Sequence, residues 1–305
     1  MKSNKINILL FFFVAIALSS CDKVDDPFAD QDLSEVIIDE TVVYATIADD
    51  AAGRGALIMD FTGHNCTNCP GAALEAERIH DDYEEDVIIM AVHPTIDQLT
   101  TPLNFHPLGG FSTDWTTPVG EYLQGVYAVP QSIPKGVISG LEIGGSYALN
   151  KGEWRGVVES IITEDLPLKI DIVKGYSPVH RSFIVEADVT ALSAIDGGLS
   201  IVVALIESGM EDWQLNGTES FPSNPDYPGG EIENYPHNHV LRQHLNGLQG
   251  ADLETASVAS GTTFSYSHSA NISPDYISEN TAIIVYVYNK TTQEIYQAVE
   301  FHLVD

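Results

Sequence analysis

The residues best suited to chemistry are two cysteines, Cys66 and Cys69, within the segment Gly63–Pro70. A short apolar run precedes this segment and an Ala-, Leu- and Glu-rich stretch follows it, so Cys66 is expected near the start of a helix. There the helix dipole and free amide groups stabilise a thiolate and lower its pKa. Cys69, one turn further along, could resolve a mixed disulfide. The spacing therefore predicts a pair capable of thiol–disulfide exchange.

Two histidines are candidates to assist this pair. His64 stands two residues before Cys66, and as an imidazolium it could stabilise a thiolate or donate a proton. The alternative is a histidine in a surface loop. His93 ends a predicted strand directed toward the same region, where a structural role is the alternative. Both cysteines with a histidine would also suit Cu(I) or Zn(II), but we predict neither a metal nor a cofactor.

A further histidine cluster, His237, His239 and His244, lies in a long polar segment between residues 209 and 250. Metal binding is one interpretation. The favoured one is a packed connection whose polar groups form local hydrogen bonds. The acid surplus raises the question of calcium, yet the sequence contains no calcium-binding loop of the Asp-x-Asp-x-Asp-Gly type. It also lacks the Gly-x-Ser-x-Gly, phosphate-loop and His-Glu-x-x-His motifs.

The N-terminus predicts export. Lys2 and Lys5 precede an unbroken apolar run over residues 8–18, which is too short to span a bilayer and suits a signal-peptide core. The run ends in Leu-Ser-Ser-Cys21, which resembles the lipobox of bacterial lipoproteins. The resemblance implies a signal peptide over residues 1–20 and a lipid on Cys21 that binds the protein to a membrane. An ordinary signal peptide with a chance cysteine is the alternative.

The charge of the chain excludes one class of partner. Its 305 residues include 13 Lys and Arg against 44 Asp and Glu, a net charge of −31 that becomes −33 when residues 1–20 are removed. Such a chain repels phosphate, so we predict no nucleic-acid partner. Residues 21–34 are acidic and predict a flexible tether. With Cys21 lipidated, a single cysteine pair remains, too few for a disulfide framework.

The elements that must position the cysteines follow from the hydrophobic pattern. Residues 55–62 and 87–93 predict buried strands around a helix over residues 71–83, which together form a βαβ unit. A helix over residues 117–126, a strand over 135–139 and an amphipathic helix beginning at Trp154 complete the first part.

After residue 165 the pattern alternates with a period of two. Six strands are predicted, over residues 168–173, 182–192, 199–206, 263–272, 281–288 and 295–304. Strands with turn residues between them favour an antiparallel sandwich. We therefore predict one domain over residues 35–165 and a second over residues 166–305.

The strand over residues 56–61 with Cys66-x-x-Cys69 after it resembles the active-site region of the thioredoxin fold. The resemblance implies that Asp60 is the buried acid that assists proton transfer. It further implies that Ile133-Pro134 is the cis-proline segment that packs against the dithiol and pairs with substrate backbone, with Pro130 as the competing candidate. The predicted fold is an α/β thioredoxin-like domain followed by an all-β, immunoglobulin-like sandwich.

The sequence departs from thioredoxin in having Thr67-Asn68 between the cysteines and Pro70 after them. The cluster from Asp60 to Pro70 instead resembles the Omp28-related outer-membrane lipoproteins of Bacteroidetes. Further matching pieces are Pro134-x-Gly136, the helix beginning at Trp154 and the segment from Tyr235 to Arg242. The resemblance implies an outer-membrane lipoprotein, periplasmic or surface-exposed, with a thioredoxin-like domain before a β-sandwich.

Two functions remain open from the sequence. In the first, a membrane-anchored oxidoreductase exchanges disulfides with thiol-containing proteins: Cys66 attacks, Cys69 resolves, Asp60 moves a proton and Pro134 presents the substrate backbone. In the second, the protein is a non-catalytic binding or assembly lipoprotein of the surface. Cys66–Cys69 is then a structural disulfide, and the partner site lies between residues 209 and 250.

Overall fold

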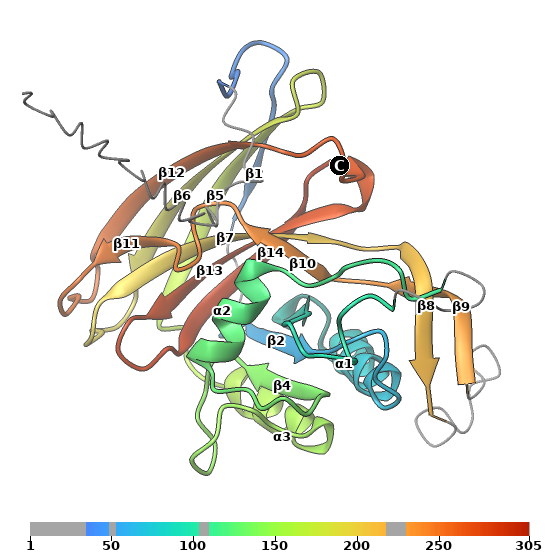
Figure 1. Ribbon diagram of the computed structural model, residues 1–305. Helices are drawn as coiled ribbons and strands as arrows, with labels where there is room; N and C mark the ends of the chain where they lie inside the picture. Colours follow the sequence, from blue (N-terminus) through green and yellow to red (C-terminus); the bar gives the residue numbers. More distant parts are fainter. Residues whose placement is uncertain (1–34, 49–52, 104–109, 218–229, 305) are drawn as a thin grey trace, which may run out of the picture. The chain divides into compact units, whose positions relative to one another are not determined.

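The computed structural model describes residues 35–48, 53–103, 110–217 and 230–304 (Figure 1). Within these ranges most of the regular structure is β-strand, accompanied by three α-helices. None of the described helices is long and apolar enough to cross a membrane. The predicted signal peptide, Cys21 and the acidic tether lie outside the described residues.

The cysteines lie in a strand–helix–strand unit, as their sequence context predicts. Strands β2 (Ala56–Phe61) and β3 (Val87–Val92) are parallel neighbours, and helix α1 (Cys69–Tyr83) connects them. Every residue of β2 is buried, as expected of a short apolar run in the middle of a sheet. Pro70 occupies the first turn of α1, where a missing N–H leaves no hydrogen bond unmade. The 3-10 turn η1 (Glu84–Asp86) leads from the helix into β3.

Strand β4 (Lys135–Ile138) lies antiparallel to β2 on the far side from β3. Helix α2 (Pro118–Val126) precedes it, and helix α3 (Lys151–Ile161) follows it after a reversing connection. A capping box between Asn150 and Glu153 begins α3. The indole of Trp154 packs directly over Gly136, where an added Cβ would lie 2.3 Å from the ring. Glycine at this position therefore lets α3 approach the sheet closely.

The second part of the chain supplies a sandwich of two sheets. All six strands predicted after residue 165 are present: β5 (Leu168–Ser177), β6 (Ser182–Ala191), β7 (Leu199–Glu207), β12 (Thr263–Asn271), β13 (Thr281–Asn289) and β14 (Ile295–His302). The 3-10 turn η2 (Ser278–Asn280) precedes β13. One sheet has the order β1 (Val43–Ile47), β5, β6, β12, and the other contains β14, β13 and β7. Alternate residues of both sheets, among them Ile170, Phe183, Val203 and Val285, fill the core between them.

The larger sheet does not end at the sandwich. Strand β10 (Val240–His244) pairs antiparallel with β7 and parallel with β3, and the amide of Ala91 donates to the carbonyl of His239 at 2.8 Å. The sheet therefore runs without a break in the order β14-β13-β7-β10-β3-β2-β4. In addition, β1 (Val43–Ile47) pairs with β5. Strands from before and after the boundary predicted at residue 165 thus belong to one continuous β-sheet.

The segment between residues 209 and 250, predicted as a polar excursion, contains more strand than its composition indicates. Strands β8 (Met210–Asn216) and β9 (Gly230–His237) form a two-stranded sheet of their own, which we call the β8–β9 hairpin. Strand β11 (Ala251–Glu254) follows and pairs with β7. The hairpin lies beside α1, at the cysteine end of the molecule (Figure 1).

Candidate functional site

Cys66 and Cys69 form a disulfide with a Cα–Cα distance of 5.4 Å. Cys66 lies in the loop after β2, and Cys69 is the first residue of α1, so the predicted position at a helix start is confirmed. Cys66 is 3 % exposed and Cys69 is 1 % exposed. Both sulfur-bearing residues are therefore withdrawn from water in the oxidised protein.

One wall of the disulfide is the segment before β4. The Ile133–Pro134 peptide bond is cis, as the resemblance to thioredoxin implies for this proline. The Sγ atom of Cys66 lies 3.6 Å from the carbonyl oxygen of Ile133. A sulfur in a disulfide carries no proton, so this is a packing contact in the oxidised state. A thiol at Cys66 could donate to the same oxygen.

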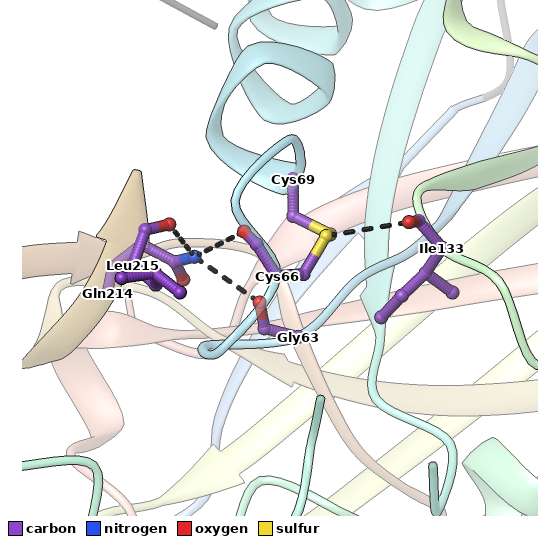
Figure 2. Close-up of a disulfide and its surroundings, with 6 residues drawn as sticks. All are labelled: Gly63, Cys66, Cys69, Ile133, Gln214 and Leu215. Atoms are coloured by element: carbon purple, nitrogen blue, oxygen red, sulfur yellow. Dashed lines mark hydrogen bonds between the residues drawn. A yellow bond between two sulfur atoms is a disulfide. The ribbon is translucent and has the colours of Figure 1, made fainter. Parts of the chain in front are cut away.

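The opposite wall is strand β8, as Figure 2 shows. The side-chain amide of Gln214 donates to the carbonyl of Gly63 at 3.3 Å and to the carbonyl of Cys66 at 3.2 Å. The amide of Leu215 donates to the carbonyl of His64 at 2.7 Å, and that of Gly217 to Thr67 at 2.8 Å. The end of β8 and the residue after it are thus hydrogen-bonded to the backbone of the cysteine loop.

Asp60 lies on β2 and is 2 % exposed. Its Oδ1 atom has no hydrogen-bond partner among the described residues. Burial raises the pKa of this carboxyl to about 8, so the neutral acid predominates at neutral pH. The resemblance implied a buried acid at this position, and the structure places one there.

A cavity of about 120 Å³ connects Asp60 with the inner side of Cys69. His93, His237, Glu77 and Asn238 also line it. A cavity of this volume with these polar groups in its wall has room for several water molecules.

His64 is completely buried, so it is not the surface-loop histidine that was the alternative. Its Nε2 atom lies 3.2 Å from the carbonyl of Thr101, and its ring makes an edge contact with Phe111. Burial lowers the pKa of His64, which favours the neutral ring. The predicted role as an imidazolium stays a prediction that this burial disfavours.

The three histidines of the polar segment do not gather at one point. His237 lies in the cavity beside Trp115, and burial lowers its pKa to about 4. His239 lies 3.4 Å from Glu77; burial opposes its protonation, but the hydrogen bond and charge of Glu77 outweigh this and raise its pKa. His244 bonds the carbonyl of Leu248, the local hydrogen bonding that the sequence favoured.

Sequence analysis did not predict that His237 lies near the cysteines. The β8–β9 hairpin brings it there, and a pattern of neighbouring residues cannot reveal a contact between distant segments. The ring of His237 lies 6.4 Å from that of His93, so two neutral imidazoles share the cavity. Burial lowers the pKa of His93 well below its usual value. Within the described ranges, no group of three or more His, Cys, Asp or Glu residues is arranged to hold a metal ion.

Comparison with known proteins identifies the second part of the chain. A model of the family described as outer membrane protein Omp28 matches residues 143–303. The chain belongs to the Omp28 family. The match covers α3 and every strand from β5 to β14, which confirms the family resemblance and the outer-membrane location. The cysteine pair precedes the matched residues, so family membership carries no information about the disulfide.

A solved structure in the same family is a domain of the outer membrane lipoprotein Omp28 from Porphyromonas gingivalis. It is 18 % identical, covers 44 % of this chain and 85 % of its own, and has a TM-score of 0.27. A likeness this distant carries no structural argument here. No curated protein matches the chain.

Proposed function

We propose that this Omp28-family protein is a non-catalytic outer-membrane lipoprotein with a binding or assembly role, anchored through acyl chains on Cys21. Cys66–Cys69 is then a structural disulfide. The observation that carries this proposal is the burial of both half-cystines, 3 % and 1 % exposed, between Ile133 and strand β8.

The physical reason is that an attacking thiolate has little access to the disulfide. Thiol–disulfide exchange needs a thiolate to approach one sulfur of the disulfide. Here strand β8 hydrogen-bonds across the cysteine loop and the Ile133 carbonyl occupies the other side. Closing so short a loop stabilises the folded state by about 2 kcal/mol on the chain-entropy model. The disulfide therefore suits a structural role, in which it fixes the conformation of the cysteine loop to which β8 is hydrogen-bonded.

A second candidate function is thiol–disulfide exchange in a thioredoxin-like site. Three observations favour it: Cys69 begins α1, the carbonyl of Ile133 contacts the Sγ atom of Cys66, and Asp60 has a raised pKa next to the cavity that Cys69 also lines. The Cys66 thiolate would attack a partner's disulfide and release one partner thiol. Cys69 would then attack the Cys66 sulfur and release the second, leaving the partner reduced and this pair oxidised. That sequence requires strand β8 to leave the cysteine loop.

The Cys66→Ala/Cys69→Ala variant separates the two candidates. A structural disulfide predicts a folded, membrane-located protein whose free energy of unfolding is about 2 kcal/mol lower. It also predicts that the unaltered protein shows no turnover in reduction of insulin or reshuffling of scrambled ribonuclease. Turnover that disappears in a Cys66→Ala variant would establish the second candidate instead.

The anchor is tested separately with Cys21→Ser. We expect this variant to leave the membrane fraction, because the acyl chains supply the binding energy. Unchanged membrane association would overturn the lipoprotein part of the proposal and leave the disulfide part intact.

A further inference from the structure

Exposed apolar side chains concentrate at one end of the sandwich. Of eight large hydrophobic residues exposed among the described residues, six lie in three neighbouring segments: Ile37, Ile38, Val43, Tyr44, Val179 and Ile277. We call these six residues the apolar end. Val43 and Val179 are 68 % and 69 % exposed. Single exposed apolar residues are normal on a protein surface, but a group gathered at one end indicates a contact site.

Hydrogen bonds join the segments that carry these residues. The amide of Ile37 donates to Ser182 Oγ at 3.2 Å, and Asp39 lies 3.2 Å from His180, beside Val179. Val43 is paired with Tyr176 in the sheet. The hydroxyl groups of Tyr176 and Ser278, the residue after Ile277, lie 2.8 Å apart.

Arg181 links two segments at the apolar end through hydrogen bonds. Its guanidinium donates to the carbonyls of Ile272, Ser273 and Tyr276. The turn that bears Val179 is therefore fixed to the loop that bears Ile277, so little conformational entropy is lost when this end contacts another surface.

The chain outside the described residues indicates what covers this surface. Only thirteen residues separate Cys21 from Glu35, the first described residue, and Ile37 follows two positions later. An extended chain of this length spans at most about 45 Å. A lipid on Cys21 would hold the folded part within this distance of the membrane, at high effective concentration, so a weak contact with lipid would be occupied.

We propose that the apolar end lies against the lipid surface of the outer membrane, with Val43 and Val179 at the boundary between headgroups and acyl chains. The inference rests on the proposed lipid anchor at Cys21. Glu35, Asp39 and Glu40 flank Ile37 and Ile38 and outnumber the positive charge of Arg181 at this end, so we expect the contact to favour zwitterionic lipid and to be weakened by anionic lipid.

The test uses the full lipidated chain with a fluorescent label attached at a Val179→Cys substitution. The matched control is Leu192→Cys, since Leu192 is also exposed, at 47 %, and follows the opposite end of β6. Both proteins are bound to phosphatidylcholine vesicles that contain nitroxide-labelled lipid. We expect quenching several-fold stronger at position 179 than at position 192, and weaker quenching at 179 when phosphatidylglycerol is added.

The possible outcomes distinguish failure of the proposed lipid contact from failure of the proposed lipid anchor at Cys21. Equal quenching at the two positions, in protein that floats with the vesicles, overturns the inference and retains the lipoprotein. Protein that does not float overturns both. Shielding of position 179 that depends on protein concentration without vesicles overturns the inference and indicates a second copy as the occupant.

A second set of variants checks that the apolar side chains cause the contact. Val43→Asp in the labelled Val179→Cys protein is expected to reduce quenching to the level at position 192, while flotation persists through the anchor. Ile143→Asp is the control, because Ile143 is 41 % exposed and lies outside the apolar end. Quenching unchanged by Val43→Asp contradicts the proposed contact.

Discussion

At the scale of single residues, the buried carboxyl of Asp60 is the most unusual group in the structure. It is 2 % exposed, its Oδ1 lacks a partner among the described residues, and burial raises its pKa to about 8. A neutral acid beside the cavity that Cys69 also lines is compatible with either candidate function. It also makes the stability of the protein depend on pH, whichever function is correct.

Asp60→Asn is expected to flatten that dependence. Between pH 4 and pH 8 the unfolded carboxyl, with a pKa of 3.8, has lost a proton that the folded one keeps. Unfolding then releases a proton, so the free energy of unfolding falls as pH rises, by as much as about 4 kcal/mol at pH 7. The side-chain amide of asparagine does not titrate, so this fall in the free energy of unfolding is absent in the variant. Urea denaturation at pH 5 and pH 8 should show a smaller decline in the variant.

Asp97→Asn is the control for this experiment, because it makes the same change at an exposed aspartate. An Asp60→Asn profile parallel to that of the unaltered protein would contradict the raised pKa.

The residues of the site were predictable to different degrees. The cysteine pair was visible from spacing, while Asp60 and Pro134 came from the resemblance to thioredoxin, and the structure places all four in one region. His237 was not connected with the site, because its contact depends on the β8–β9 hairpin returning to α1 across more than a hundred residues of sequence. A single sequence carries no record of such a contact.

At the scale of elements, strand β8 determines whether the disulfide is accessible. The side chain of Gln214 donates to the backbone of the cysteine loop, at the carbonyls of Gly63 and Cys66. The backbone amide of Leu215 adds a hydrogen bond to the carbonyl of His64. Changing the Gln214 side chain therefore weakens the cover without altering the disulfide.

Gln214→Ala is expected to lower the free energy of unfolding by about 1–2 kcal/mol through the lost hydrogen bonds. It should also make Cys66–Cys69 several-fold faster to reduce with dithiothreitol in the folded protein, measured by trapping the thiols with maleimide. Glu211→Ala on the same strand is the matched control, since Glu211 is exposed. An unchanged reduction rate in Gln214→Ala would show that β8 does not limit access.

The strands predicted correctly are those whose burial requires a recognisable pattern of apolar residues. Strands β5, β6, β7, β13 and β14 enter a core, so their apolar residues alternate or form runs. Strands β8 and β9 are largely polar and lie outside the main sheets, so their sequence resembles a loop. Their pairing is stabilised by backbone hydrogen bonds to each other and to the cysteine loop, which side-chain patterns do not report.

At the scale of the whole described structure, β10 joins strands of the two predicted domains into a single sheet. It contacts β7 of the sandwich on one side and β3 of the strand–helix–strand unit on the other. Sequence periodicity identifies strands but not their neighbours, so the junction was not predictable. Because each half completes the sheet of the other at β10, we expect the halves to lose their structure together.

The unaltered protein is therefore expected to unfold in a single transition, with the same midpoint by tryptophan fluorescence and by far-ultraviolet circular dichroism. The three tryptophans, Trp115, Trp154 and Trp213, lie before α2, in α3 and on β8, so the fluorescence reports on the cysteine-containing part, whereas the dichroism is dominated by the sandwich strands. Val240→Asp should separate the transitions, because Val240 is 1 % exposed at the β3–β10 junction and an unpaired carboxylate there costs about 3–5 kcal/mol. Val179→Asp, at an exposed valine, should leave both midpoints unchanged. Two transitions in the unaltered protein would show that the halves fold independently despite the shared sheet.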